Sequence, residues 1–266
     1  MPHKRKEWLD IILVSRGIFA SREKAKSFIL AGSVRVNEAV VDKPGTRVDI
    51  DANISVAEKP RYVSRGGEKL EYTLDAFEIS PAGMRALDVG ASTGGFTHCL
   101  LLGDAACVYA LDVGYGQLDF SLRNDPRVTV LEKTNIRYVT PADFPHKFDL
   151  ITVDVSFISL RLVLPVVKGL LAPSGRIVAL VKPQFEAGRD KVGKGGVVRD
   201  RSVREDVLFG IIGFCEEIGL AVLNAVRSPL RGPKGNIEFF LFLSEMPEGS
   251  AVSSVEADKI REIAGG

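Results

Sequence analysis

The chain has 266 residues, of which 45% are hydrophobic, and it carries a net charge of +1. We expect one full-sized α/β core and a smaller second domain. Charges such as Asp149 and Arg161 interrupt the longest apolar stretch, the first residues lack the apolar run of a secretory signal, and the cysteines form no CxxC pair. These observations predict a cytoplasmic protein without a membrane span, a disulfide framework or a metal site.

The N-terminal segment, residues 1–59, is predicted to form a small α+β domain. Leu9 and Ile12 belong to the apolar stripe of one helix, Ser21 is a suitable N-cap for a second helix, and SVRVN, AVV and ISVA are typical of brief strands. Residues 1–36 hold eight basic and three acidic residues, a net charge of +5. Such a concentration of positive charge is typical of a surface that binds RNA phosphates, but also of an ordinary solvated helix face.

The stretch SRGIFASREKAKSFILAGSVRVNEAVV resembles the RNA-binding domain named after ribosomal small-subunit protein four, which carries the alpha-L motif. Signals for helix, cap, glycine and strand follow one another in the order of that family. The resemblance implies affinity for folded ribosomal RNA. The candidate RNA-binding residues are Arg16, Arg22, Lys24, Lys26, Arg35 and Arg65.

Residues 60–67 are predicted to be a linker, because Pro60 and the pair Gly66-Gly67 punctuate them. Lys69 follows at the start of an expected helix, so the linker can help to position this lysine. The large domain is expected over residues 68–245. Residues 246–266 are expected to be a C-terminal tail, for which the sequence predicts little.

From Arg85 onward, strand-like runs alternate with helical stretches. These runs are RALDVGA, CVYALDVG, VTVLEK, FDLITVDVSF, GRIVALVKP, LAVLNAVRS and IEFFLFL. The alternation predicts a doubly wound, mostly parallel sheet, which binds ligands beyond the carboxyl ends of its strands. The last run follows the sixth after SPLRGPKG, which is too short for a helical crossover, so the seventh strand is expected to be antiparallel.

A glycine-rich turn after the first strand marks a candidate cofactor site. Its glycines let the backbone approach a ligand, and Asp112 at the end of the second strand can accept hydrogen bonds from ribose hydroxyls. The pattern D-x-G-x-x-x-G-G and the antiparallel last strand favour S-adenosylmethionine over a dinucleotide and resemble class I methyltransferases. The candidate cofactor-binding residues are Asp88, Gly90, Ala91, Ser92, Thr93, Gly94, Gly95, Phe96, Thr97, Asp112, Asn135, Asp154 and Phe157.

Several of these signals have other interpretations. Residues 90–94 also satisfy the G-x-S-x-G elbow of α/β-hydrolases, but His98 and His146 do not follow a late strand as a catalytic histidine of that fold does. Asn135 is equally typical of a turn, and an aromatic residue such as Phe157 is commonly part of a core.

Four charged residues, Lys69, Asp154, Lys182 and Glu238, are expected to meet at the sheet edge. Asp154 ends FDLITVD, Lys182 ends RIVALVK and Glu238 begins EFFLFL. Charges at such positions pair with one another or take part in chemistry. We expect Lys182 to take the proton of a ribose 2′-hydroxyl, with Lys69 as a second cation that favours the neutral amine. Asp154 and Glu238 orient the two amines. The alternative is a pair of structural salt bridges.

The four residues match, in order and strand position, the Lys-Asp-Lys-Glu tetrad of FtsJ-like ribose 2′-O-methyltransferases. Together with the N-terminal domain, the chain up to residue 245 resembles the TlyA family, also labelled haemolysin A. This resemblance implies methylation of the 2′-oxygen of cytidine in the rRNA of assembled ribosomal subunits. Two other functions remain open: a non-catalytic RNA-binding or ribosome-assembly factor, which the intact glycine loop disfavours, and a membrane-active haemolysin, which the missing lytic helix disfavours.

Overall fold

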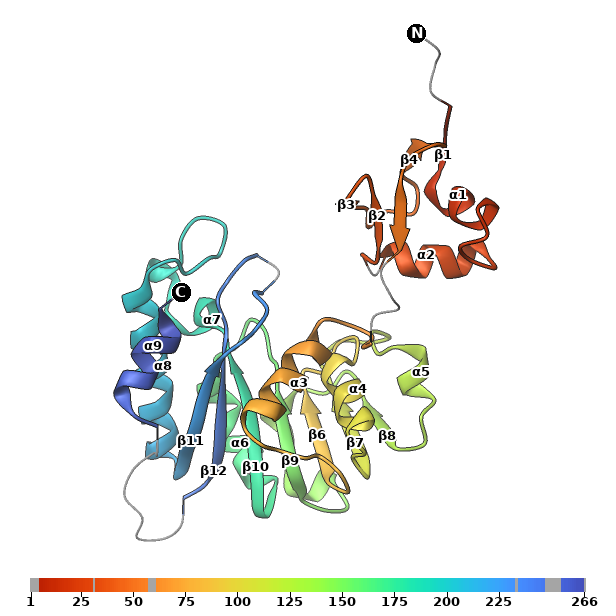
Figure 1. Cartoon of the computed structure of the whole chain (residues 1–266). Helices are drawn as coiled ribbons and strands as arrows, with labels where there is room; N and C mark the ends of the chain where they lie inside the picture. Colours follow the sequence, from red (N-terminus) through yellow and green to blue (C-terminus); the bar gives the residue numbers. More distant parts are fainter. Residues whose placement is uncertain (1–4, 31, 57–60, 233, 247–254, 266) are drawn as a thin grey trace. The chain divides into compact units, whose positions relative to one another are not determined.

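The computed structural model describes residues 5–30, 32–56, 61–232, 234–246 and 255–265. The chain divides into two compact units, Met1–Ser64 and Arg65–Gly266, which are drawn with all helices and strands in Figure 1. No helix in the described ranges has the length and apolar character needed to cross a membrane.

The smaller unit packs two helices against two small antiparallel sheets. Its elements are α1 (Leu9–Ser15), α2 (Arg22–Leu30), β1 (Lys6–Trp8), β2 (Val34–Val36), β3 (Ala39–Val40), β4 (Arg47–Asp49) and β5 (Ile54–Val56). Strand β2 pairs with β3 and β5, and β1 pairs with β4. Leu9, Leu13 and Ile29 are completely buried in the core between them. The two helices and the strands β2, β3 and β5 are confirmed, whereas β1 and β4 were not predicted.

The larger unit is built on a seven-stranded sheet of order β11-β12-β10-β9-β6-β7-β8. Its strands are β6 (Arg85–Val89), β7 (Cys107–Leu111), β8 (Val128–Leu131), β9 (Phe148–Val153), β10 (Leu171–Val181), β11 (Leu220–Arg227) and β12 (Phe239–Glu245). Strand β12 is antiparallel to β10 and β11, and the other pairs are parallel. The predicted doubly wound sheet with an antiparallel last strand is confirmed.

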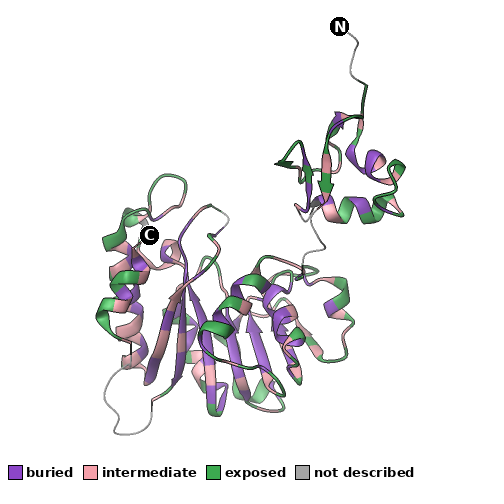
Figure 2. Ribbon diagram, in the orientation of Figure 1, coloured by how far each residue is buried: buried purple, intermediate pink, exposed green. Residues whose placement is uncertain are grey.

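Helices cover both faces of this sheet. They are α3 (Gly66–Ala76), α4 (Gly95–Leu102), α5 (Phe120–Arg123), α6 (Leu164–Gly169), α7 (Pro183–Glu186), α8 (Arg201–Glu217) and α9 (Ala257–Ala264), with 3₁₀ turns at Ile136–Tyr138 (η1), Pro141–Asp143 (η2), Leu160–Leu162 (η3) and Arg189–Lys191 (η4). Helices α3 and α4 lie on the near face in Figure 1, and α6 lies on the far face. Figure 2 shows that the strands between them are almost wholly buried, as the continuous apolar runs require.

Two segments differ from their expected roles. Pro60 lies outside the described residues, but Gly66, which we expected in the linker, begins helix α3. In the expected C-terminal tail, Ile260 and Ala264 of α9 are buried in the core of the larger unit. Arg204 Nε also donates a hydrogen bond to the carbonyl oxygen of Ala264 at 2.9 Å. Residues 257–264 are therefore a packed part of this unit.

Candidate active site

Lys69 and Glu238 form a buried ion pair. Lys69 lies in the first turns of α3, and Glu238 directly precedes β12. Lys69 Nζ donates a hydrogen bond to Glu238 Oε2 at 2.6 Å, and the two side chains are 10% and 1% exposed. A Cβ atom at Gly232 would collide with the Glu238 carboxylate, so the glycine makes room for this charge in the hairpin between β11 and β12.

Lys182 and Asp154 form a second ion pair, which solvent reaches. Lys182 Nζ lies 2.5 Å from Asp154 Oδ1 and donates a hydrogen bond to Ser156 Oγ at 2.9 Å. The lysine and aspartate side chains are 11% and 25% exposed. Among the described residues, Asp154 Oδ1 accepts no hydrogen bond, so its contact with the ammonium is a charge contact without hydrogen-bond geometry.

Strand register places the two pairs side by side. Val181 of β10 stands opposite Phe239 of β12, so Lys182 and Glu238 occupy the next opposed positions. Asp154 follows Val153, which is the last residue of β9 and pairs with Val89 of β6. The four residues of the tetrad therefore meet at the edge formed by the carboxyl ends of the parallel strands, as expected. The pairing itself was not predicted: Lys69 bonds to Glu238, and Lys182 contacts Asp154.

The glycine-rich turn lies against this edge. Gly90 has φ +87°, and a Cβ atom there would collide with the carbonyl oxygen of Asp154. Gly94, at the N-cap of α4, has φ +94°, and a Cβ atom there would collide with Leu122. Both positions require glycine for their backbone conformation and for the available space. The turn thereby brings its backbone next to Asp154.

Asp112 organises the ligand-facing side of the turn. Its Oδ2 accepts a hydrogen bond from the backbone N–H of Ser92 at 2.8 Å, and its Oδ1 accepts one from Gly114 at 2.6 Å. Each carboxylate oxygen has a further lone pair. Asp112 is partly exposed and Ser92 and Thr93 are exposed. An adenosine-containing cofactor fits this arrangement, because acceptors for its hydroxyl groups and exposed backbone stand together on one side of the turn.

Three of the candidate cofactor-binding residues are buried and support the glycine-rich turn through their contacts. Asp88 is completely buried, Thr97 likewise, and Phe96 is 3% exposed. Asp88 Oδ2 accepts hydrogen bonds from the Thr97 backbone N–H at 2.9 Å and from Thr97 Oγ1 at 2.7 Å. Asp88 Oδ1 accepts one from Thr152 Oγ1 at 3.1 Å, across the strand pair in which the two residues are opposed. Their side chains therefore hold the start of α4 to the sheet, rather than facing a ligand.

Burial raises the pKa of Asp88 to about 7, although hydrogen bonds from Thr97 and Thr152 favour the ionised form. Between the ordinary aspartate pKa of 3.8 and this raised pKa, the native state binds a proton that the unfolded chain releases. The free energy of unfolding should therefore fall as pH rises from 5 to 7, by up to about 1.4 kcal/mol per pH unit from this group. Urea titrations at several pH values measure the free energy of unfolding. In Asp88→Asn, this part of its pH dependence should be absent. Asp149→Asn is the control, because Arg85 lowers the pKa of Asp149 and its titration lies below this range. An unchanged slope in Asp88→Asn would contradict the prediction.

The other two candidate residues lie at the same sheet edge. Asn135 Oδ1 accepts a hydrogen bond from the backbone N–H of Arg137 at 3.1 Å, so Asn135 caps η1 as a turn residue does. Phe157 is 90% exposed with φ +64°, and its ring centroid lies 5.0 Å from that of Phe185. The interpretation of Phe157 as a core residue is wrong. An exposed aromatic ring on strained backbone, next to Ser156, is typical of a functional site.

Sequence reasoning missed the exposed tyrosines of this edge. Tyr115 is 72% exposed with Lys133 Nζ 4.4 Å from its ring centroid, and Tyr138 is 76% exposed beside Arg137. The signal was available, because a tyrosine in the loop VGYGQ and one next to an arginine both follow a strand end. Within the described residues, no group of three or more His, Cys, Asp or Glu residues is placed to hold a metal ion.

The candidate RNA-binding residues are distributed over both units. Arg22 forms an ion pair with Asp10 at 2.8 Å, and Lys26 lies 3.9 Å from the same carboxylate, which is 3% exposed. Both cations keep about half of their side chain in solvent, at 50% and 46%. Lys24 is exposed. This part of the predicted basic surface is thus ordered by one buried acid.

Two of the predicted RNA-binding arginines donate hydrogen bonds to backbone carbonyl groups, and a third lies outside the smaller unit. Arg16 donates hydrogen bonds to the carbonyl oxygens of Ile50 at 2.5 Å and Ala52 at 2.9 Å, so its guanidinium also fastens α1 to the loop after β4. Arg35 donates one to the carbonyl oxygen of Glu38 at 3.1 Å. Arg65 stands at the N-cap of α3 and belongs to the larger unit.

Two family models match the chain: FtsJ-like methyltransferase over residues 62–245 and S4 domain over residues 7–54. The 16S/23S rRNA (cytidine-2'-O)-methyltransferase TlyA of Mycobacterium tuberculosis is 48% identical over 90% of either chain. Hemolysin A of Brachyspira hyodysenteriae is 44% identical over 87% of this chain and 97% of its own. A solved structure from Streptococcus thermophilus that bears the name hemolysin is 43% identical, with a TM-score of 0.77 over 98% of this chain and 95% of its own. The chain therefore belongs to the TlyA family of FtsJ-like methyltransferases, with an S4 domain preceding the methyltransferase domain.

Proposed function

We propose that this protein transfers a methyl group from S-adenosylmethionine to the ribose 2′-oxygen of a cytidine in rRNA, within assembled ribosomal subunits of the cytoplasm. The two adjacent ion pairs, Lys69–Glu238 and Lys182–Asp154, carry this proposal, because they stand beside an open glycine turn at the ligand-binding edge of the sheet. The name of the Mycobacterium relative supports the nucleoside and the oxygen. The S4 domain supports an RNA substrate.

The residues that would hold the cofactor are the turn from Gly90 to Gly95, Asp112 and Asp154. The carboxylate of Asp112 would accept ribose hydroxyls through its remaining lone pairs, and the backbone of the turn would lie against the ligand. S-adenosylmethionine supplies an activated methyl group when it is bound. Asp88 and Thr97 contribute indirectly, because they hold the turn and the start of α4 in place.

Lys182 is the proposed base. In its neutral form, Nζ accepts the proton of the 2′-hydroxyl, while Asp154 keeps the nitrogen at the site and Ser156 accepts one of its hydrogen bonds. Lys69 is held by Glu238 at the neighbouring strand end, so the site contains two cations and two anions. Lys69 is the proposed second cation of the site, and the balanced charge limits the desolvation penalty.

The proposal is tested with ribosomal subunits from cells that lack this gene. The full-length protein is incubated with purified small or large subunits and labelled S-adenosylmethionine, and the label is mapped by nuclease digestion and mass spectrometry. We expect a 2′-O-methylcytidine in rRNA. Label on a base or on a protein would contradict the assignment. Cofactor binding without transfer to either subunit would favour the non-catalytic alternative, and leakage of dye from vesicles at the same protein concentration would favour the membrane-active one.

A further inference from the structure

Two loops at the carboxyl edge of the large sheet are joined by one buried side chain. They are residues 188–200, after α7, and the described residues 228–232 and 234–238, between β11 and β12, and we call them the paired loops. Asn236 is 2% exposed, its Nδ2 donates a hydrogen bond to the carbonyl oxygen of Gly196 at 2.8 Å, and its Oδ1 accepts one from the Val198 backbone N–H at 2.9 Å. The amide thus uses both its donor and its acceptor to hold the neighbouring loop.

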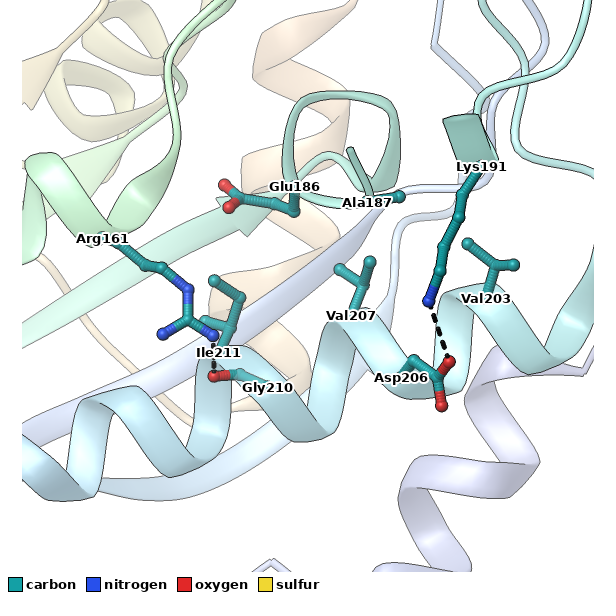
Figure 3. Close-up of a pocket in the computed structure, with 9 residues that line it drawn as sticks. All are labelled: Arg161, Glu186, Ala187, Lys191, Val203, Asp206, Val207, Gly210 and Ile211. Atoms are coloured by element: carbon teal, nitrogen blue, oxygen red, sulfur yellow. Dashed lines mark hydrogen bonds and ion pairs between the residues drawn. The ribbon is translucent and has the colours of Figure 1, made fainter. Parts of the chain in front are cut away.

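The first of the paired loops is also fixed to helix α8. Lys191 Nζ lies 3.5 Å from Asp206 Oδ2, the contact drawn as a dashed line in Figure 3. Just before the loop, Glu186 accepts hydrogen bonds from Ser159 Oγ at 2.6 Å and from the Leu160 backbone N–H at 2.8 Å, which tie α7 to η3. Residues 188–200 are therefore attached on both sides, so their exposed side chains are presented from a defined backbone.

Besides Lys191, the paired loops present four exposed cations, Lys194, Arg199, Arg231 and Lys234. Within the described ranges, none of the four lies within ion-pair distance of an acidic group. Asp200, the acid next to Arg199, instead caps α8 by accepting hydrogen bonds from the backbone N–H and the hydroxyl of Ser202. Although Asp190 and Asp200 lie on the first loop and Lys191 is paired with Asp206, basic residues outnumber acidic ones on the paired loops, and these four cations stay unpaired among the described residues.

The two loops join the candidate active site at their ends. Helix α7, which leads into residues 188–200, begins directly after Lys182, and the second loop ends at Glu238. The side chain of Lys234 also approaches the first loop. Its Nζ lies 3.5 Å from the point where a Cβ atom would stand if Gly196 had one. A polymer whose ribose enters the site must pass this edge, and a nucleic acid strand carries one phosphate for each nucleotide.

We propose that the paired loops bind the phosphate backbone of the RNA strand that carries the target ribose. This inference rests on the proposed RNA substrate and adds a contact surface on the methyltransferase domain to the one expected on the S4 domain. The surface positions RNA and takes no part in the chemical step. Removal of its lysines should therefore weaken RNA binding and reduce its salt dependence, without lowering the rate at saturating RNA.

The test compares full-length wild-type protein with the Lys194→Ala/Lys234→Ala double variant. Binding to protein-free ribosomal RNA is measured across a series of salt concentrations, and methylation is measured as a function of the concentration of purified ribosomal subunits. The slope of log K against log salt should become less negative by about 1.4–1.8, that is 0.7–0.9 for each lost phosphate contact. KM for RNA should rise, while kcat stays within about twofold, since orientation at the reacting atoms is retained. Lys147→Ala is the control: this exposed lysine precedes β9 at the opposite sheet edge and should leave the slope unchanged.

The outcomes separate this inference from the proposed function. If the wild-type protein methylates RNA but the double variant keeps the wild-type slope and KM, the paired loops are not an RNA-binding surface. If the wild-type protein methylates neither ribosomal subunit while the double variant still shows the shallower slope, the proposed activity is wrong and the surface remains supported.

Discussion

Replacing Lys182 by alanine is expected to lower the rate of methyl transfer to rRNA by about 10²–10⁴-fold, the usual contribution of a positioned general base. Lys182 Nζ has one acidic partner, Asp154, and one hydroxyl acceptor, Ser156. Single-turnover rates with saturating cofactor and ribosomal subunits measure this loss.

Cofactor binding should survive the same substitution. Asp112 and the turn after β6 are held by their own hydrogen bonds and by the buried contacts of Asp88, none of which involves Lys182. Calorimetry should therefore give an S-adenosylmethionine affinity within a few-fold of wild type. Lys147→Ala, at the far edge of the sheet, is the matched control and should leave both quantities unchanged.

Lys182→Arg distinguishes a base from a fixed charge. A guanidinium keeps the positive charge and the contact with Asp154, but it is not deprotonated in proteins. If Lys182 accepts the proton, the arginine variant should be nearly as slow as the alanine variant. If the arginine variant regains most of the wild-type rate, Lys182 acts through its charge and the base assignment fails.

The sheet and the position of the tetrad could be predicted because their signals are local. Each strand is a continuous apolar run, and Asp154 and Lys182 end two such runs, which places them at one edge. Strands β1 and β4 gave no such signal, because each has three residues and pairs with a partner far away in the chain. Helix α9 has a short apolar repeat, with Ile260 and Ala264 buried, but it follows residues without a clear pattern.

Contacts between distant residues could not be predicted in the same way. The position of Asp88 in the glycine-rich motif suggested a ligand contact, but the side chain faces Thr152 on the next strand and Thr97 on α4. Likewise, three strand ends and the start of a helix indicated which four charges meet, but not which acid each lysine contacts. Such pairing depends on side-chain direction and on space, such as that left by Gly232 beside Glu238.

Glu238→Gln is expected to destabilise the larger unit strongly. The substitution leaves Lys69 as a buried ammonium without a counter-charge, which costs about 3–5 kcal/mol when one partner of a buried pair is removed. For a unit of this size, each kcal/mol corresponds to about 2–4 °C in Tm. Thermal unfolding measures the shift. The Arg85–Asp149 ion pair, which is partly exposed, is the comparison. Asp149→Asn should lower the free energy of unfolding by at most about 1 kcal/mol at neutral pH.

An apolar double variant, Lys69→Met/Glu238→Leu, separates a structural ion pair from a catalytic one. Removing both charges leaves no unpaired group, and replacement of buried ion pairs by apolar side chains is often neutral or stabilising by about 1–4 kcal/mol. Its Tm should therefore return to near the wild-type value. If the pair served only to stabilise the sheet edge, methyl transfer would return as well. Because we assign Lys69 to the catalytic tetrad as its second cation, we expect a folded protein that binds cofactor but transfers methyl at least about tenfold more slowly than wild type. A stable double variant with wild-type rates would reduce this pair to a structural salt bridge and leave Lys182 and Asp154 as the reactive part of the tetrad.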